Sequence, residues 1–378
     1  MGRGYIYPTH LEAPHMTIGI DCRLSGKAHA GLGRYTENLI REILSTDKKT
    51  SYVLFFFDTI QANTVLGTFQ NADNVRIVIA PVKHYSLREQ LQMPWYYYTA
   101  KLDLLHVPHF NVALLYFSKT VVTIHDLLWH EKRGSTVTTL SPMVYWLKYA
   151  FYHIVTRVAV SRSATVLVPS KTVKKTVLKH YPFAKEKIKV TQEGTHLTTP
   201  KKVPKRKQQQ LLYVGSLYPH KNIRLVIDAL KQLPKTSLVI IGSRNNFQKK
   251  VEQYVKNRKL QQRVSFLGYV SDSTLTQQYL QATALVQPSF SEGFGLTGLE
   301  ALSLQTPILV SDIPIFREVY KDAATYFDPH SIESFISGYK KIQKQSVRSF
   351  KKRAEHVAAS YSWKKMAKET LAVYRSSS

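Results

Sequence analysis

Acidic residues and cysteine are scarce in this chain of 378 residues. Its 25 Asp and Glu stand against 53 Lys and Arg, which leaves a formal net charge of +28. The single cysteine, Cys22, excludes an internal disulfide framework and is typical of a reducing compartment. No uncharged apolar run reaches the length of a membrane-spanning helix. The nearest, residues 140–162, is broken by Lys148, His153 and Arg157 and is predicted to be an amphipathic helix.

The positive charge predicts polyanionic partners: nucleic acid, an anionic membrane surface or phosphorylated small molecules. The sequence has none of the features of a recognised nucleic-acid module, such as zinc-ligand spacing, an RNP-type aromatic motif or a basic zipper. Its basic residues are spread along the whole chain, so we interpret most of the charge as a general property of the surface. Apolar residues make up 44% of the chain, which excludes a disordered polycation.

The length suits two domains of ordinary size, and the pattern of the sequence agrees with this. Short β-branched runs alternate with helical patterns, first over residues 16–22, 52–57, 75–80, 103–108, 120–126, 164–170 and 188–193, then over 211–216, 236–243, 263–270, 282–289, 306–312 and 324–329. Near-continuous apolar strands joined by helices are typical of parallel sheets covered on both faces. We therefore expect two Rossmann-like, doubly wound α/β domains that face a central cleft.

Breaks in this pattern predict the domain boundaries. Residues 1–15 have no helical or strand period and no apolar run typical of a secretory signal, so we interpret them as a leader or tail. The basic, proline-containing stretch 200–210 is interpreted as a linker between an N-terminal domain, 16–199, and a C-terminal domain, 211–355. The last segment, 356–378, contains an amphipathic helix. Ligands of doubly wound sheets bind beyond the carboxyl ends of the strands, so functional residues are expected there.

The most informative segment, residues 287–312, joins a predicted strand to a helix through a glycine-containing loop. Gly293 and Gly295 let the backbone approach a ligand, and the N–H groups at a helix N-terminus favour phosphate. Glu292 precedes the helix, whereas Glu300 lies inside it among apolar residues and needs a polar partner, such as ligand hydroxyls. A helix cap together with a carboxylate satisfied by the protein would explain the same spacing equally well.

Two other strands are followed by candidate binding residues. The strand 211–216 ends in Gly215 and Ser216, and Lys221 follows near the start of the next helix. The helix dipole disfavours a cation at this position, and a phosphate that binds beside the lysine would explain it. The alternative is an ordinary solvated lysine. The strand 120–126 places His125 at the cleft as a candidate hydrogen-bond partner, with a structural histidine as the alternative.

The N-terminal half contains a second glycine-rich segment, GLGRY, at residues 31–35. We predict a loop that opens a helix, in which Gly31 and Gly33 form a backbone cradle for phosphate or sugar. The segment lacks the G-x-G-x-x-G fingerprint, so a nicotinamide cofactor is not indicated. His106 and His109 are placed like the histidine above, but their pattern is less specific.

Together these segments resemble the retaining, nucleotide-sugar-dependent glycosyltransferases of family 4, which have the two-domain GT-B fold. The resemblance spans nearly the whole chain from Met16. It is carried by the E-x7-E pattern EGFGLTGLE from Glu292 to Glu300, and by TPILVSDIPIFREV (306–319), YVGSLYPHKN (213–222), VVTIHDLLW (121–129) and GLGRY. The last helix is similar to the family's terminal helix, which crosses back to the N-terminal domain. Among subgroups, the chain looks most like bacterial mannosyl- or rhamnosyl-type transferases of surface polysaccharide pathways.

The resemblance implies a role for each candidate residue. Glu300 would bind the ribose hydroxyls of the nucleotide, and Glu292 the hydroxyls of the donor sugar. Lys221 would neutralise the diphosphate leaving group, and His125 would contact the transferred sugar near the reacting carbon. The catalytic set is thus His125, Glu292 and Lys221. The other donor-binding positions are Gly31, Gly33, Gly215, Ser216, Phe294, Gly295, Leu296 and Thr297, several of them through the backbone.

The chain departs from the family at one place. Many relatives carry an arginine beside or before the lysine, where this chain has Ser216 and His220. Stabilisation of the leaving group is then expected to rely on Lys221, the helix N-termini and the nearby Arg224.

The activity implied is that of a retaining hexosyltransferase. The donor is expected to be a nucleotide diphosphate sugar, with GDP-mannose first and a UDP-hexose next, and the acceptor a glycan or a lipid-linked molecule. Neither a cofactor nor a metal is expected, since no Asp-x-Asp cluster stands at a strand end with the neighbours that a metal-dependent transferase needs. A non-catalytic binding protein of the same fold, a phosphorylase or sucrose-type synthase, and a basic nucleic-acid-binding protein remain as alternatives, although no nucleic acid is expected.

Residues 83–101 predict the acceptor side. They mix basic and aromatic side chains, namely Lys83, Arg88, Trp95, Tyr96, Tyr97, Tyr98 and Lys101. This mixture suits an interface with headgroups or a lipid-linked acceptor. We therefore expect a cytoplasmic protein that binds peripherally to the inner face of the plasma membrane. An amphipathic helix that docks on its own domain is the alternative.

Overall fold

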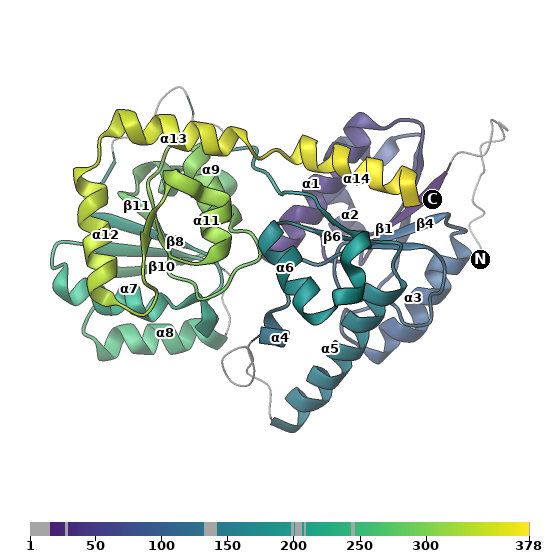
Figure 1. The fold of residues 1–378 in the computed structure, drawn as a ribbon, viewed down its shortest axis with the longest axis horizontal. Helices are drawn as coiled ribbons and strands as arrows, with labels where there is room; N and C mark the ends of the chain where they lie inside the picture. Colours follow the sequence, from purple (N-terminus) through teal and green to yellow (C-terminus); the bar gives the residue numbers. More distant parts are fainter. Residues whose placement is uncertain are drawn as a thin grey trace.

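The computed structural model describes residues 16–26, 29–131, 142–197, 200, 206–207, 209–242 and 246–377. Within these residues the chain forms two α/β domains side by side, so the molecule is longer than it is wide (Figure 1). The predicted leader, 1–15, and most of the predicted linker, 200–210, lie outside the described residues.

The N-terminal domain contains a seven-stranded parallel sheet in the order β3-β2-β1-β4-β5-β6-β7. The strands are β1 Thr17–Asp21, β2 Ser51–Phe56, β3 Val75–Ile79, β4 Leu104–Val107, β5 Thr120–Thr123, β6 Thr165–Val168 and β7 Ile188–Val190. Each coincides with a run that the sequence predicts. The central strands are almost wholly buried because they are apolar on both faces and helices cover both sides.

The C-terminal domain repeats this plan with six parallel strands in the order β10-β9-β8-β11-β12-β13. They are β8 Gln210–Val214, β9 Ser237–Ile241, β10 Val264–Gly268, β11 Ala284–Gln287, β12 Ile308–Ser311 and β13 Thr325–Phe327. The two-domain fold with two doubly wound sheets is therefore confirmed.

Helices connect the strands and flank both sheets (Figure 1). In the N-terminal domain they are α1 Ala30–Thr46, α2 Thr59–Leu66, α3 Leu87–Thr99, α4 Leu128–Glu131, α5 Pro142–Arg162 and α6 Lys171–His180, with the 3-10 turns η2 Gly67–Asn71 and η4 Pro182–Lys187. The later ones are α7 Ile223–Ala229, α8 Asn246–Asn257, α9 Asp272–Gln281, α10 Leu296–Ser303, α11 Pro314–Tyr320, α12 Ile332–Lys344, α13 Val347–Ala359 and α14 Trp363–Ser377, with η5 Pro219–Lys221, η6 Leu230–Gln232 and η7 Lys321–Ala323. Side chains of Ser86, Ser170 and Ser271 cap the N-termini of α3, α6 and α9.

The strand order places the functional edge of each domain. In both sheets the first strand lies beside the fourth, which puts the change of direction between β1 and β4 and between β8 and β11. Loops leave the sheet on opposite sides at such a point and open a crevice at the carboxyl ends of the strands. The segments after β8 and β11 contain Lys221 and Glu292, the residues that the sequence singles out.

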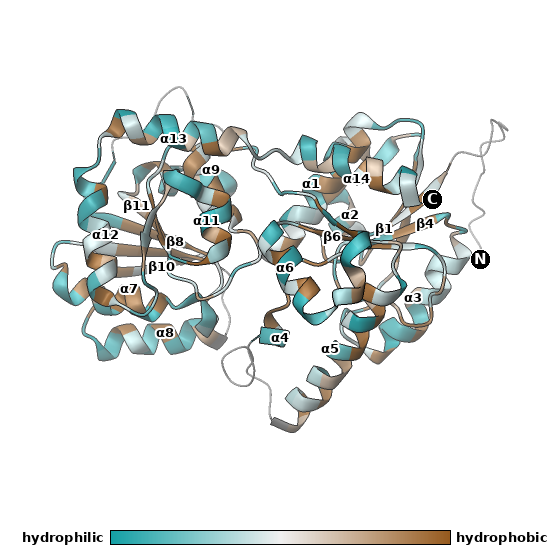
Figure 2. Ribbon diagram, in the orientation of Figure 1, coloured by the Kyte–Doolittle hydropathy of each residue, from teal (hydrophilic) through white to brown (hydrophobic). Residues whose placement is uncertain are grey.

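The last helix does not pack on the domain that precedes it. Helix α13 lies along the C-terminal domain, and the chain then crosses so that α14 lies beside α1 (Figure 1). Trp363, Met366, Leu371 and Tyr374 of α14 join the apolar core on one side of the N-terminal sheet. Figure 2 shows apolar strands in both domains and hydrophilic outer faces on most helices. No helix in the described part of the chain is long and apolar enough to cross a bilayer.

Candidate active site in the cleft between the domains

The strand ends of the two domains meet through contacts that are far apart in sequence. A Cβ atom on Gly293, after β11, would collide with the backbone carbonyl of His125, after β5. The hydroxyl of Ser170 donates to the carbonyl of the same glycine over 3.4 Å. On α11, Glu318 accepts hydrogen bonds from the backbone N–H groups of Lys171 and Thr172 at the start of α6, over 2.7 and 2.8 Å. The segment that follows β11 is therefore packed against the N-terminal domain.

Glu292 and Lys221 form an ion pair at the centre of the C-terminal half of the cleft. The Lys221 ammonium donates to Glu292 Oε2 over 2.7 Å, and the Ser289 hydroxyl donates to Oε1 over 2.7 Å. Burial raises the pKa of Glu292, but the lysine charge and these hydrogen bonds outweigh burial and hold the pKa below its ordinary value. Two residues that the sequence assigns to the same donor are thus in direct contact, with a carboxylate that is ionised at neutral pH.

Helix α10 begins beside this pair, and its N-terminus has no side-chain cap. Gly295 has φ 102°, in the left-handed region that favours glycine. Its carbonyl accepts a hydrogen bond from the Tyr320 hydroxyl over 2.5 Å, and the Gln287 amide donates to the Thr297 hydroxyl over 2.8 Å. The Phe294 side chain is buried in the core, so only its backbone is available to a ligand. This construction leaves the backbone N–H groups of the first turn of α10 as donors at the cleft.

Glu300, one turn further along α10, is buried and has two partners from different domains. Its Oε1 atom is ion-paired with Arg34 of α1, and its Oε2 atom accepts a hydrogen bond from the Tyr279 hydroxyl over 2.8 Å. Burial raises the pKa of Tyr279, so its hydroxyl stays protonated and donates. Sequence reasoning missed Arg34, although it stands inside the GLGRY segment that it identified.

The backbone after β8 is shaped for close approach. Gly215 has φ 150°, and a Cβ atom on Gly242 would collide with the Gly215 carbonyl. The Tyr213 hydroxyl donates to the Ser216 carbonyl over 2.5 Å, which fixes the turn that leads to Lys221. Lys221 ends η5, and Asn222 in the left-handed region starts α7 after it.

One sequence interpretation needs correction at the N-terminal side of the cleft. The predicted loop 31–35 is instead helical and lies in the first two turns of α1, which already begins at Ala30. Gly33 has a packing reason, since a Cβ atom there would collide with the backbone of Gly26, whose N–H donates to the Gly33 carbonyl over 3.2 Å. A Cβ atom on Gly31 would have no neighbour within 4 Å. Packing therefore requires glycine only at the second of the two positions.

His125 is held between two acceptors. Its Nδ1 atom lies 3.1 Å from Glu193 Oε1, and its Nε2 atom lies 3.1 Å from the Pro108 carbonyl. The edge of the Tyr35 ring contacts it, with ring centroids 4.6 Å apart. These three contacts fix the orientation of the His125 ring at the end of β5.

The other two candidate histidines, His106 and His109, lie in different environments. His106 lies inside β4 and is fully buried, where its two ring nitrogens meet the hydroxyls of Tyr374 and Thr123 at 2.6 and 2.8 Å. It is a core residue, so the expectation that it faces the cleft is wrong. His109 follows β4, and its ring packs on Phe110 with centroids 3.9 Å apart.

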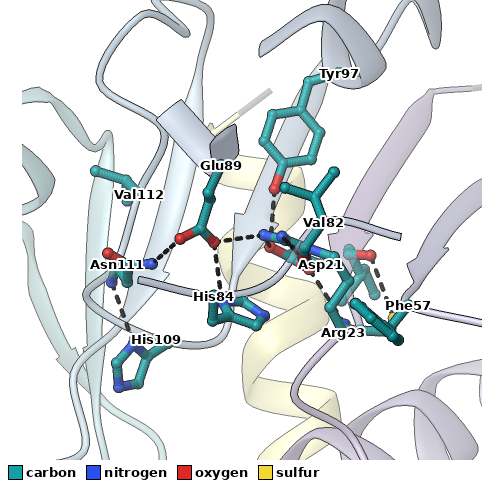
Figure 3. Close-up of polar contacts among 12 residues, drawn as sticks. Asp21, Arg23, Phe57, Val82, His84, Glu89, Tyr97, His109, Asn111 and Val112 are labelled. Atoms are coloured by element: carbon teal, nitrogen blue, oxygen red, sulfur yellow. Dashed lines mark hydrogen bonds and ion pairs between the residues drawn. The ribbon is translucent and has the colours of Figure 1, made fainter. Parts of the chain in front are cut away.

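A buried network of charged side chains lies at the end of β1 in the N-terminal domain (Figure 3). Arg23 binds both oxygens of Asp21, at 2.9 and 2.6 Å, and reaches Glu89 of α3 at 2.8 Å. Asn111 donates to the other oxygen of Glu89 over 2.6 Å. Burial raises the pKa of Asp21, yet the Arg23 charge and hydrogen bonds dominate and hold it well below its usual range. The network ties α3 and the loop after β4 to the end of β1.

The structure places most of the predicted residues after the carboxyl ends of strands: His125 after β5, Gly215, Ser216 and Lys221 after β8, and Glu292, Gly295, Leu296, Thr297 and Glu300 after β11. Contacts join the three segments, since Lys221 binds Glu292 and Gly293 lies against the carbonyl of His125. In the described part of the chain, no group of three or more His, Cys, Asp and Glu side chains could hold a metal ion. Of the partners that sequence reasoning missed, Arg34 lies inside the GLGRY motif, whereas Glu193 and Tyr279 carry no local motif, and tertiary packing pairs all three with the site residues.

Comparison with known protein families gives two matches that together span most of the chain. Residues 30–198 match Glycosyltransferase Family 4, and residues 197–363 match Glycosyl transferases group 1. The two matches meet between the domains, at 197–198.

Individual proteins are similar to the chain as well. The O-antigen chain mannosyltransferase RfbU of Salmonella typhimurium is 32% identical over 255 residues, which cover 66% of this chain and 70% of that protein. The O-antigen chain mannosyltransferase B of Escherichia coli is 32% identical over 176 residues, 44% of this chain and 46% of the relative. Among solved structures, Anabaena Alr3699/HepE in complex with UDP and glucose has a TM-score of 0.70 at 17% identity, covering 96% of this chain and 100% of that one.

Proposed function

Since the chain belongs to glycosyltransferase family 4, we propose that it transfers a hexose, with retention of configuration, from a nucleotide diphosphate sugar to a glycan or lipid-linked acceptor. The observation that carries this proposal is the Lys221–Glu292 pair beside the uncapped start of α10. A cation, free N–H groups and a fixed carboxylate stand together there. A diphosphate and a sugar need these three kinds of group at once.

Each group has a role in this scheme. The diphosphate lies against the first turn of α10, where Gly295 and Thr297 offer backbone N–H groups, and Lys221 neutralises its charge. Glu292 accepts hydrogen bonds from donor-sugar hydroxyls. Glu300 accepts the ribose hydroxyls, and His125 faces the transferred sugar from the other domain.

The reaction follows from this placement. The bond from the anomeric carbon to the diphosphate oxygen breaks, and its electron pair goes to the diphosphate. Negative charge therefore grows where the ammonium and N–H groups are already aimed, which lowers the barrier. The acceptor oxygen bonds to the same face of the anomeric carbon, and its proton passes to an oxygen of the leaving phosphate. The scheme uses no metal and no cofactor.

The donor sugar is proposed to be mannose, carried on GDP, with a UDP-hexose as the next candidate. Two similar proteins are O-antigen mannosyltransferases by name, which supports mannose and a surface polysaccharide as the product. Binding by the purified chain to GDP-mannose, UDP-glucose, UDP-galactose and UDP-N-acetylglucosamine, measured by saturation-transfer NMR, tests the donor. Transfer is then measured as nucleoside diphosphate release with and without lipid-linked acceptors. We expect one nucleotide sugar to bind and to be turned over.

The result separates the alternatives. If no nucleotide sugar binds, the proposed function is wrong. If one binds but is neither hydrolysed nor transferred across a broad set of acceptors, the chain is a non-catalytic binding protein. Salt-dependent retention on DNA without nucleotide-sugar binding would instead support a nucleic-acid-binding protein.

We further propose that the N-terminal domain binds an anionic membrane surface from the cytoplasmic side. Helix α3 buries Met93 and Tyr97 but exposes an apolar stripe at the spacing of one helix face: Leu87, Leu91, Trp95 and Tyr98 are 80, 67, 62 and 46% exposed. The exposed basic residues Arg88 and Lys101 lie beside the stripe. Such a face suits the headgroup region, where each nearby basic residue contributes about 1 kcal/mol.

Helix α5 exposes further apolar side chains. Its Met143, Trp146, Leu147 and Ile154 are all exposed. The segment around Leu115 joins the two helices, because the Tyr98 hydroxyl donates to the Leu115 carbonyl and Arg162 of α5 donates to the Leu114 carbonyl. A membrane on this side would bring a lipid-linked acceptor to the domain that faces the transferred sugar.

A further inference from the structure

The ion pair between Arg34 and Glu300 joins the two domains at the position proposed for the ribose. Arg34 lies in the second turn of α1 in the N-terminal domain, and its side chain is 38% exposed. Glu300 lies on α10, and its side chain is 5% exposed. Glu300 is therefore held in the interior of its domain, whereas Arg34 is partly exposed to solvent and belongs to the other domain.

Both oxygens of the Glu300 carboxylate are already engaged. Arg34 takes Oε1, and the Tyr279 hydroxyl takes Oε2. An ionised carboxylate has about four acceptor positions, of which these two partners use one each. Because the Glu300 side chain is only 5% exposed and that of Arg34 is 38% exposed, the position held by the guanidinium is the one that a ribose arriving from solvent would take. The tyrosine belongs to the same domain as the carboxylate, so the arginine is the partner that has to move.

The surroundings determine where a released guanidinium would go. Leu296, at the start of α10, packs against the core cluster that contains Tyr35, the neighbour of Arg34 on α1. This contact and the ion pair of Glu300 place the start of α10 against the N-terminal domain, and the uncapped N-terminus of α10 lies about one helical turn from Glu300. A cation that leaves the carboxylate stays within reach of a diphosphate bound at that N-terminus.

We propose that Arg34 is a displaceable substitute for the ribose: it holds Glu300 in the donor-free site, yields to the ribose hydroxyls, and moves to the donor diphosphate. This inference rests on the proposed function, because it assumes a nucleotide at Glu300. It adds a donor-binding residue that the glycine-rich segment of α1 supplies.

The proposal predicts effects of opposite sign on two probes. A nucleoside competes with Arg34 for Glu300 and gains nothing from the released charge. A nucleoside diphosphate also competes, but it gains a charge-assisted hydrogen bond. Arg34→Met should therefore bind the nucleoside more tightly than the wild type and the diphosphate more weakly. The affinity ratio between diphosphate and nucleoside should fall roughly tenfold or more.

The experiment compares GDP with guanosine and UDP with uridine by isothermal titration calorimetry, at constant salt. The wild type first identifies which base binds. Arg34→Met and Arg34→Lys are then measured with that pair, and lysine should keep part of the ratio because it keeps the charge. The control is Glu318→Gln. This substitution weakens another carboxylate contact between the domains, the one that Glu318 makes with the start of α6, and it lies outside the proposed nucleotide site. It should change both affinities by the same factor.

The outcomes are distinct. If Arg34→Met changes the two affinities by the same factor, or changes neither, Arg34 is only a structural ion pair and the inference is wrong. If Glu318→Gln reproduces the altered ratio, domain closure accounts for it and the inference fails as well. If the wild type binds none of the four probes, the proposed function itself fails. Because Arg34 is partly exposed, circular dichroism should confirm that its variants fold.

Discussion

At the scale of the residue, the cleft is organised by carboxylates that already have cationic partners. Lys221 is paired with Glu292, and Arg34 with Glu300, so neither acidic residue is an isolated charge. A buried carboxylate without a partner is costly, which explains why each has one. The two cations differ in their position: Lys221 belongs to the same domain as its carboxylate, whereas Arg34 belongs to the other domain.

Replacing Lys221 by methionine should mainly affect the chemical step. The ammonium stabilises charge that develops on the leaving diphosphate, so we expect kcat to fall roughly 100-fold or more. Turnover of the donor identified by the binding panel measures this, with the exposed Lys231→Met as the control. A kcat close to that of the wild type would exclude Lys221 from stabilising the leaving group.

The two glycines at the start of α1 form a matched pair. Gly33→Ala places a methyl group against the backbone of Gly26, so it should lower the melting temperature and cost at least about 2 kcal/mol of stability. Gly31→Ala meets open space and replaces glycine by a better helix former, so stability should be unchanged or rise by up to about 1 kcal/mol. Thermal unfolding of both variants measures the difference, and equal effects would contradict this packing argument.

At the scale of the element, α3 has two faces with different uses. One face carries Glu89 into the buried network of Arg23 and Asn111, which fixes the helix on its domain. The opposite face carries the exposed stripe of Leu91, Trp95 and their neighbours. A helix that only docks on its own domain needs the first face and has no use for the second.

The double variant Leu91→Ser/Trp95→Ser should separate the two uses. We expect it to reduce binding to phosphatidylglycerol-containing vesicles in a sedimentation assay at physiological salt, because apolar area and aromatic anchoring are lost. Thermal stability should stay within about 0.5 kcal/mol of the wild type, since both side chains are exposed. Ile60→Ser, which removes an equally exposed apolar side chain from α2, is the control. Failure of the wild type to bind these vesicles would contradict the membrane proposal.

At the scale of the whole molecule, α14 connects the end of the chain to the N-terminal domain. Its Tyr374 hydroxyl meets His106 Nδ1 inside the core, and Thr123 meets the other ring nitrogen. Burial lowers the pKa of His106 to about 3, so the imidazole is neutral in the folded protein. The helix that crosses between the domains is therefore held in part by a histidine that cannot accept a proton without disrupting it.

This arrangement makes stability depend on pH. The unfolded chain takes up a proton at His106 near its ordinary pKa of 6.5, and the folded chain takes it up only near 3. The contribution is thus complete above about pH 6.5 and is lost as the pH falls toward 3, with a slope of about 1.4 kcal/mol per pH unit for one proton. Denaturant unfolding between pH 7.5 and about 4.5 should show a shallower loss in His106→Gln than in the wild type. His330→Gln, at an exposed position, is the control, and parallel curves for His106→Gln and the wild type would contradict this origin.

The fold was largely predictable from the sequence because its signals are local. The thirteen strands within the described residues stand out in the sequence as β-branched runs between helical patterns, and parallel sheets covered on both faces follow from their apolar composition. The same applies to Glu292, Glu300 and Lys221, which follow strands at recognisable spacings. The start of α1 was misplaced because two glycines weaken a helical pattern, whereas tertiary packing against Gly26 holds them in the helix.

What the sequence determined by itself was therefore the two α/β domains and the candidate residues at the ends of their strands. What only the tertiary structure decided was pairing: Glu300 with Arg34, His125 with Glu193, and His106 with Tyr374, 268 positions away. The physical reason is that local patterns depend on neighbours along the chain, while a salt bridge or a buried hydrogen bond depends on distance in space. We interpret most of the +28 charge as a property of the surface. The proposed roles of two cations, Arg34 and Lys221, depend on the carboxylates that the fold places beside them.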